Sequence, residues 1–356
     1  MFVYYTCKRN TESYFKLSKY FNQIMDGAFD YKNDRKQKYY TFRQEIYRHS
    51  VWETEWCNNT ISLNIEDTLV DPECLYHTFS IPKRTGGYRE ICAPVDELKI
   101  KQTEILNKLK QLCPYPHEAA YAYVEERSTK DAMEKHLKNK SHWYLKLDLH
   151  GFFPSCTRLF VMQQLDKIYP FYKLSSASKD LIRKYCFKDG ALPQGAPTSP
   201  YLSNIIMIPI DYDINKYCME NNLVYTRYAD DIIISGYNKF DWRTVENFIK
   251  ETLPENLQLN TDKTRFGSAS GRNWNLGLMV TNDKITVGNQ RKRRLKQALY
   301  NYQKTKNTWE LNDLQHLLGE LQYVIQIEPD IYDKMFKPKF GDVRQEIINQ
   351  IKALNI

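Results

Sequence analysis

Two apolar runs around a pair of adjacent aspartates are the feature that most constrains this chain. The segment 223–236 reads LVYTRYADDIIISG, and the β-branched and aromatic residues on both sides of its polar tip are typical of a β-hairpin. Hairpin turns ordinarily carry Asn-Gly or Asp-Gly, whereas this one carries Asp230 and Asp231. Neighbouring carboxylates repel each other unless a counter-charge is present. We therefore expect a divalent cation at this turn.

A third acidic residue stands in another apolar run. The segment 145–153, LKLDLHGFF, predicts a short strand with Asp148 in its middle. A buried carboxylate is costly unless it is paired or binds a metal. Three carboxylates on adjacent strands would hold two Mg²⁺ ions, for which Mn²⁺ could substitute. Two such ions can activate a 3′-hydroxyl and steady a leaving pyrophosphate, so the acids predict a nucleotidyl-transfer site.

The segments around these acids predict a mixed α+β fold. A first hairpin is expected at 79–94, turning at Gly86 and Gly87. A Gly/Pro-rich loop should lead into a helix with Ser199 at its N-cap, and Pro209 should interrupt that helix. Apolar spacing or composition predicts helices in three further places: 99–112, 157–187 and the residues after 287.

Composition favours a nucleic-acid partner. The 356 residues carry a net charge of +8 and are 14% aromatic, and aromatics interleaved with Lys and Arg suit stacking on bases beside phosphate contacts. The eight cysteines are scattered and lack the spacing of zinc ligands. The first residues lack the order of a signal peptide, and no apolar run is long enough to span a bilayer. We expect a cytoplasmic protein with no membrane partner.

Four motifs resemble those of bacterial reverse transcriptases and occur in the same order. They are the IPK-x-x-GG-x-R-x-I of 81–91, the D-x-x-x-F-F of 148–153, the PQG-x-x-x-SP of 193–200 and the YADD of 228–231. The sequences NTDKT at 260–264 and NLGL at 275–278 extend the match. YADD alone would be a weak signal, but four ordered motifs are specific.

The resemblance implies the metal ligands. Asp148, Asp230 and Asp231 would bind the catalytic ions, and the backbone carbonyl of Leu149 would be a further oxygen ligand. An ordinary polar turn at the aspartate pair is the alternative, and it leaves Asp148 in an apolar run without an explanation.

The resemblance also implies the residues of a nucleotide site. Lys83 and Arg89, on the first hairpin, would hold the incoming triphosphate. Phe153 would stack under the sugar and exclude a 2′-hydroxyl, Gln194 would contact the nucleotide from the other side, and Lys263 would lie near the pyrophosphate as a proton donor. The alternatives are a core aromatic at position 153 and solvated surface charges at the cationic positions.

A basic run near the C-terminal end predicts contact with a nucleic-acid backbone. The window 284–306 holds eight Lys or Arg residues and no Asp or Glu. On a helix these side chains cannot all face one way, and Arg293 and Lys296 share one side. A solvated helix face is the alternative. The candidate nucleic-acid-binding residues are Arg291, Lys292, Arg293, Arg294 and Lys296.

The resemblance implies a right-hand polymerase architecture. This is an α+β fold with fingers, a palm built on an antiparallel sheet, and a helical thumb. We expect fingers at 61–145, a palm at 146–285 with a fingers insertion around 157–200, and a thumb at 286–356. Residues 1–60 would form an appendage whose role the resemblance does not explain.

Within that family the amino-acid sequences of two motifs are most similar to those of retron reverse transcriptases, which copy part of a dedicated non-coding RNA. These motifs are LPQGAPTSPYLSN and IPKRTGG. Two departures stand against this. Where retrons carry N-A-x-x-H, the chain has DAMEKH at 131–136, and where they carry V-T-G it has NLG at 275–277. A defence-associated reverse transcriptase outside the retrons is therefore a competing interpretation.

The predicted function is RNA-directed DNA synthesis in a retron-like antiphage defence system. Its partners would be a structured non-coding RNA template, the DNA product, deoxynucleoside triphosphates and an effector protein, with the oligomeric state left open. Two alternatives remain. One is template-independent or protein-primed synthesis at the same site, and the other is an RNA-binding scaffold that holds an effector.

Overall fold

A four-stranded antiparallel sheet lies at the centre of the computed structural model, which describes residues 60–354 except 83–85, 114, 270–273 and 282–283. The strand order is β4-β5-β3-β6. The strands are β3 (Trp143–Asp148), β4 (Leu223–Tyr228), β5 (Asp231–Gly236) and β6 (Arg265–Ser268). β4 pairs with β5 as the predicted hairpin, so that prediction is confirmed. β3 and β5 are mostly buried, which agrees with their nearly continuous apolar sequence.

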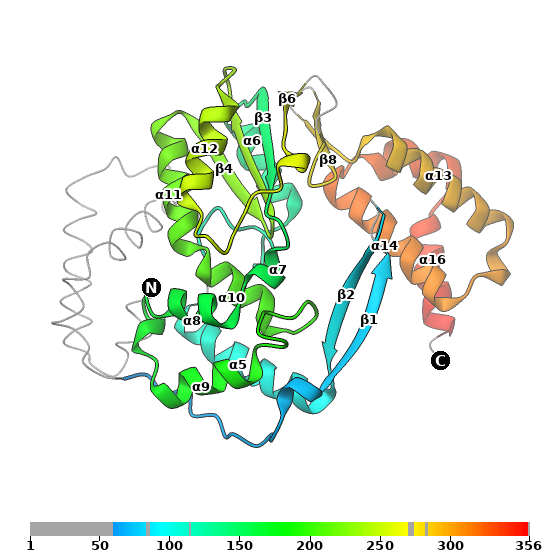
Figure 1. The fold of residues 1–356 in the computed structure, drawn as a ribbon. Helices are drawn as coiled ribbons and strands as arrows, with labels where there is room; N and C mark the ends of the chain where they lie inside the picture. The colour runs from blue at the N-terminus through cyan, green and yellow to red at the C-terminus, as the bar shows by residue number, and fades with distance from the viewer. Residues whose placement is uncertain (1–59, 83–85, 114, 270–273, 282–283, 355–356) are drawn as a thin grey trace, which may run out of the picture.

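The two faces of this sheet pack into two different hydrophobic cores, because side chains alternate along each strand. Leu145 and Ile232 lie in a first core with residues of three helices. Tyr144 and Ile233 lie in a second core with Met133. Three of the helices that contribute to the first core are α10 (Thr198–Ile206), α11 (Ile208–Glu220) and α12 (Trp242–Thr252), and Met133 belongs to α6 (Thr129–Lys138) (Figure 1).

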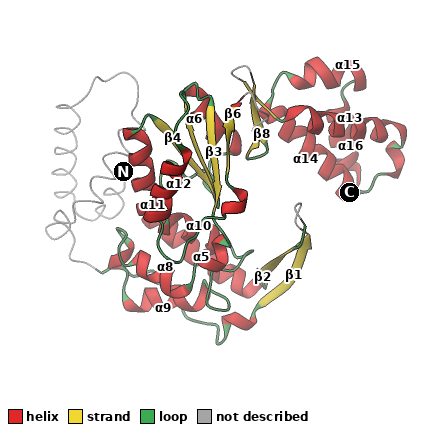
Figure 2. Ribbon diagram, turned by 45° about the horizontal axis from the view of Figure 1, so that its top comes forward, coloured by secondary structure: helices red, strands yellow, loops and turns green. Residues whose placement is uncertain are grey.

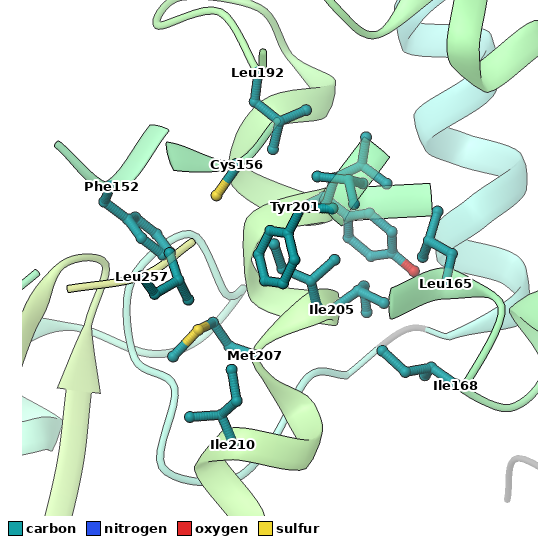
Figure 3. Close-up of a cluster of buried hydrophobic side chains, with 14 of the residues drawn as sticks. Phe152, Cys156, Leu165, Ile168, Leu192, Tyr201, Ile205, Met207, Ile210 and Leu257 are labelled. Atoms are coloured by element: carbon teal, nitrogen blue, oxygen red, sulfur yellow. The ribbon is translucent and has the colours of Figure 1, made fainter. Parts of the chain in front are cut away.

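The first core continues below the sheet into a helical region. Figure 3 shows Phe152, Leu192 and Tyr201 among its buried side chains. The helix expected at 99–112 is confirmed, while the segment 157–187 holds two α-helices and a short 3₁₀ turn. The elements are η2 (Pro72–Cys74), α5 (Asp96–Leu112), α7 (Phe152–Ser155), α8 (Arg158–Leu165), η3 (Phe171–Lys173) and α9 (Ser176–Tyr185).

The strand predicted at 145–153 is shorter than expected. β3 ends at Asp148, so this residue stands at the end of the strand and not in its middle. Gly151 adopts a left-handed backbone with φ of +51°, which turns the chain into α7. Phe152 and Phe153 therefore belong to a helical turn. The apolar pair FF continued the strand pattern in the sequence, and this is why the boundary was wrong.

The start of α10 also differs from the prediction. The helix begins at Thr198 with Pro197 at its N-cap, so Ser199 lies inside the first turn and does not cap it. The interruption near Pro209 is confirmed, because Met207 separates α10 from α11. Proline is tolerated in the first turn of a helix and excluded from its interior.

Two smaller sheets and a group of helices complete the described fold. The first predicted hairpin is confirmed as β1 (Tyr76–Pro82) paired with β2 (Tyr88–Pro94). Figures 1 and 2 show this hairpin and the C-terminal helices on the same side of the central sheet. The remaining elements are β7 (Trp274–Asn275), β8 (Leu278–Thr281), β9 (Lys284–Thr286), η4 (Thr261–Lys263), α13 (Gly288–Lys304), η6 (Lys306–Thr308), α14 (Leu311–Ile327), the π-helix η7 (Tyr332–Phe336), α15 (Lys337–Phe340) and α16 (Val343–Leu354).

The N-terminal appendage expected at 1–60 lies almost wholly outside the described residues. Within the described part of the chain, no helix has the length and apolar character needed to cross a membrane. The cysteines described there are free thiols, and all except Cys74 are buried.

Candidate active site

The three predicted carboxylates lie together at one end of the central sheet. The register of β3 and β5 places Asp148 directly opposite Asp231, and side chains directly opposite each other share one face. Asp230 lies with Ala229 in the two-residue turn between β4 and β5. The backbone N–H of Leu149 donates a 3.0 Å hydrogen bond to the carbonyl of Asp230, which ties the end of β3 to this turn.

Two lysines supply positive charge to this cluster. Lys263 Nζ donates to both carboxylate oxygens of Asp148 at 3.0 Å, and Lys146 Nζ lies 2.8 Å from Asp231 Oδ1. Burial raises the pKa of Asp230, and the negative charges of Asp231 and Asp148 raise it further. The two ammonium groups therefore reduce the repulsion between the three neighbouring carboxylates.

Phe153 lies on α7, the helical turn that follows the end of β3. The residue is half-buried, and its ring contacts the ring of buried Phe152 at a centroid distance of 5.6 Å. The ring of Tyr123 also approaches it, at 6.3 Å with an interplanar angle of 61°. Phe152 and Phe153 thus lie on one helical turn and not on the strand expected at 145–153.

The loop with Gln194 is docked against the β1–β2 hairpin. The backbone carbonyl of Gln194 accepts a 2.7 Å hydrogen bond from the N–H of Cys92 in β2. Gly195 has a φ of +123°, and a Cβ at this position would lie 2.8 Å from the carbonyl oxygen of Cys92. This close backbone approach requires glycine. Arg89 is exposed on β2, while Lys83 lies outside the described residues.

Comparisons with known proteins agree with this arrangement. The family model described as reverse transcriptase (RNA-dependent DNA polymerase) matches residues 81–298. The chain belongs to the reverse transcriptase family. It is 32% identical to the Retron Ec83 reverse transcriptase of Escherichia coli, over 76% of this chain and 88% of the relative. It is 30% identical to the Retron Ec73 reverse transcriptase of the same species, over 77% and 90%.

A solved structure is similar at a lower level. Apo telomerase from Candida tropicalis aligns with a TM-score of 0.47 and 13% identity, over 86% of this chain and 67% of that chain. The assignment of this reverse transcriptase to its family rests on the sequence relatives. Its α+β fold, with an antiparallel sheet, a projecting hairpin and C-terminal helices, is as expected.

The donor chemistry of the cluster fits a divalent metal ion, which enzymes of this family use. Carboxylates are ligands for Mg²⁺, which proteins commonly bind through one or two carboxylates and the substrate phosphates. Among the described residues, no group of three or more His, Cys, Asp or Glu side chains is arranged to hold a metal by itself. This agrees with the two lysines bonded to Asp148 and Asp231.

The five basic candidates on α13 divide into two groups. Arg291 makes two hydrogen bonds to the Glu320 carboxylate, at 3.0 and 2.8 Å, and Lys292 lies 2.6 Å from Glu328. Glu320 lies in α14 and Glu328 directly follows it, so both acids are outside the basic run 284–306 in the sequence. Arg293 and Arg294 are exposed and Lys296 is half-buried, and none of the three has an ion pair with another described residue.

Sequence reasoning missed Lys146. It lies two residues before Asp148 on β3, so both side chains point to the same face of the sheet. Its partner Asp231 stands on the neighbouring strand. A lysine in an otherwise apolar strand, at i−2 from a candidate ligand, was the signal that could have identified it.

A buried arginine behind the turn was also missed. Arg227, on β4, is fully buried and donates to both carboxylate oxygens of Asp211 on α11, at 2.8 and 2.7 Å. It also donates to Asn204 Oδ1 and to the carbonyl of Ala229, each at 3.1 Å. The bond to Ala229 holds the turn with Asp230 from the side of the first core. A charged residue in an apolar strand directly before YADD was the available signal.

The residues of the two motifs that depart from the retron pattern take part in the fold, through a helix cap, buried hydrogen bonds and a turn between strands. Asp131 forms a capping box with Ser128 at the start of α6. His136 is buried and forms hydrogen bonds with the hydroxyl groups of Ser235 and Thr226, at 2.6 and 2.7 Å, on the sheet face that packs into the second core. Burial lowers the pKa of His136 to about 3. The turn at 275–277 joins β7 to β8, and β8 packs on α6.

Proposed function

We propose that this reverse transcriptase is the RNA-directed DNA polymerase of a retron and copies a structured non-coding RNA into DNA. The observation that carries the proposal is the strand register. It brings Asp148 opposite Asp231 beside the turn with Asp230, although Asp148 is far from the pair in the sequence. Similarity to reverse transcriptases named for retrons over most of the chain supports the choice of system.

The carboxylates would hold two Mg²⁺ ions, or Mn²⁺ in their place, with the Leu149 carbonyl as a further ligand. When bound, such ions supply the positive charge that activates a 3′-hydroxyl and stabilises the leaving pyrophosphate. The Lys263 side chain is 55% exposed, so it can leave Asp148 and reach a nucleotide phosphate. Its Nζ would donate a proton to the pyrophosphate oxygen that leaves the α-phosphorus.

The nucleotide would lie between the β1–β2 hairpin and α7. Arg89 would contact the triphosphate together with Lys83, Phe153 would face the sugar, and the loop with Gln194 would contact the nucleotide from the other side. The hydrogen bond between Cys92 and Gln194 supports this, because it couples the hairpin to the loop. The substrates would be deoxynucleoside triphosphates, since Phe153 would exclude a 2′-hydroxyl.

The domain boundaries are part of the same proposal. Fingers would comprise 61–145, the palm 146–285 with a fingers insertion around 157–200, and the thumb 286–356. The exposed basic residues of α13 would contact the phosphates of the template–product duplex. An effector protein and a role in antiphage defence remain predictions from the resemblance, and a cytoplasmic location remains a prediction from the cysteines and the first residues.

Primer extension on an RNA template tests the proposal. Asp230→Asn should lower the rate of DNA synthesis by at least about 100-fold, the size expected when one preorganised charged group is lost from an active site. Asp262→Asn is a matched control, because this exposed aspartate is next to Lys263 and outside the carboxylate cluster. Template binding and thermal stability should be unchanged in both variants. Equal synthesis by Asp230→Asn and the parent would refute the assignment.

A further inference from the structure

Tyr123 has an unusual backbone for a residue that is half open to solvent. Its φ is +60°, in the left-handed region that residues with a side chain rarely occupy, and 53% of its surface is exposed. A strained residue persists only where its surroundings hold it, and such residues cluster at functional sites.

The backbone next to Tyr123 is held from two sides. The carbonyl of Ala122 accepts a 2.8 Å hydrogen bond from Asn204 Nδ2 on α10. The N–H of Tyr121 donates to the carbonyl of Arg227 at 2.8 Å, and the N–H of Arg227 donates to the carbonyl of Ala119 at 2.6 Å. Arg227 also holds the turn with Asp230, so one buried residue fixes both segments.

The side chain of Tyr123 contacts one residue of the proposed nucleotide site. Its ring stands edge-on to Phe153 at 6.3 Å with an interplanar angle of 61°. The segment that carries Tyr123 is also tied to β4 beside the turn with Asp230, through the hydrogen bonds of Arg227.

We propose that Tyr123 is a positioning residue of the nucleotide site, whose ring holds Phe153 and thereby sets the selectivity for deoxyribonucleotides. The inference rests on the proposed role of Phe153. The Phe153 ring contacts two aromatic rings, those of buried Phe152 and of exposed Tyr123. Without Tyr123 the ring of Phe153 can turn toward solvent, which leaves room for a 2′-hydroxyl.

Single-nucleotide incorporation on a primed RNA template tests this inference, with kcat/KM measured for a deoxyribonucleotide and for the matching ribonucleotide. Tyr123→Ala should lower the ratio of the two values by about threefold to tenfold, the size expected for the loss of one aromatic pair. Tyr123→Phe keeps the ring and should keep the ratio. Tyr237→Ala is a matched control, because Tyr237 is 57% exposed and stands edge-on to His142 at 5.1 Å at the far end of the sheet.

Two further variants distinguish the role of Tyr123 from that of Phe153. They are Phe153→Ala and the double variant that combines Tyr123→Ala with Phe153→Ala. If Tyr123 acts through Phe153, the double variant should have the ratio of Phe153→Ala alone. A loss of kcat/KM in Tyr123→Ala that is equal for both nucleotides overturns the inference, while a relaxed ratio in Phe153→Ala still supports the gate. An unchanged ratio in an active Phe153→Ala variant overturns both. A changed ratio in Tyr123→Phe assigns the effect to the hydroxyl and overturns the role of the ring.

Discussion

The carboxylate cluster of the central sheet and the basic run of α13 differ in what their ion pairs do. In the sheet, Asp148 is buried and its lysine partner is open: the Asp148 side chain is 8% exposed and that of Lys263 is 55% exposed. On α13, Lys292 and Glu328 are both largely covered, at 15% and 20%. Glu328 also accepts hydrogen bonds from Thr286 and from the N–H of Val287.

This difference separates exchangeable charges from structural ones. A lysine with an exposed head group can leave a carboxylate when another cation arrives, at little cost in stability. A covered pair with further hydrogen bonds cannot be replaced in this way, since removal of one partner leaves the other buried and unpaired. The Lys292–Glu328 pair therefore fastens α13 to the end of α14, whereas Lys263 can release Asp148 to another cation.

The largest effect on stability is expected at the covered pair. Glu328→Gln should lower the free energy of unfolding by about 1.5–3 kcal/mol, the range for hydrogen bonds to charged groups, as measured by denaturant titration. Glu346→Gln is the control, because Glu346 pairs with Lys306 where both side chains are more than 40% exposed, and should cost less than about 1 kcal/mol. Equal losses in the two variants would contradict the distinction.

The contribution of the Lys292–Glu328 pair to stability should depend on pH, and the direction of this dependence can be stated. Burial acts to raise the pKa of Glu328, but Lys292, Thr286 and the N–H of Val287 outweigh it and lower the pKa below 4.5. A carboxylate with a lowered pKa in the folded state stabilises the protein above its unfolded pKa. The advantage of the parent over Glu328→Gln should therefore be complete at neutral pH, begin to fall near pH 4.5, and vanish once the pH has passed the lower pKa of the folded state.

A smaller effect, on the binding of nucleic acid, is expected at the exposed basic side of α13. Neutralising Arg293 and Lys296 together should weaken binding to all duplex sequences alike, because phosphate contacts carry no sequence information. The slope of log affinity against log salt should flatten by about 1.8, or about 0.9 for each lost contact if the bound duplex behaves like B-form DNA. Lys334→Gln with Lys337→Gln removes the same charge from the neighbouring segment, where each lysine is paired with an acid. An unchanged slope for the Arg293 and Lys296 variant would identify a solvated face.

The smallest effect is expected at Lys146. Lys146→Met removes a positive charge from Asp231, so Mn²⁺ should bind more tightly by about twofold to fivefold, the range of a partly exposed ion pair. Electron paramagnetic resonance of free Mn²⁺, recorded without nucleotide, measures this directly. Lys146→Arg keeps the charge and should bind as the parent does. Weaker binding by Lys146→Met would show that the lysine supports the metal site and does not compete with the ion.

The sequence predicted the hairpin with Asp230 and Asp231, because alternation and β-branched residues are local signals. It did not predict the end of β3, since FF at 152–153 continues an apolar pattern that only the turn at Gly151 interrupts. It also missed the counter-charges. Lys263 meets Asp148, and Glu320 meets Arg291, through contacts between elements distant in the chain. Such partners depend on tertiary packing, which no local pattern encodes.

The second hydrophobic core has a consequence for how the chain is made. Tyr144 and Ile233 share the second core with Met133 of α6, which precedes them in the chain, and with Leu278 and Leu321, which follow them. During synthesis the sheet and α6 can therefore form before the later part of this core exists. A chain interrupted before α13 would leave apolar residues of the second core without their later partners and be prone to self-association. The nascent enzyme thus depends on the arrival of its C-terminal helices to complete this core.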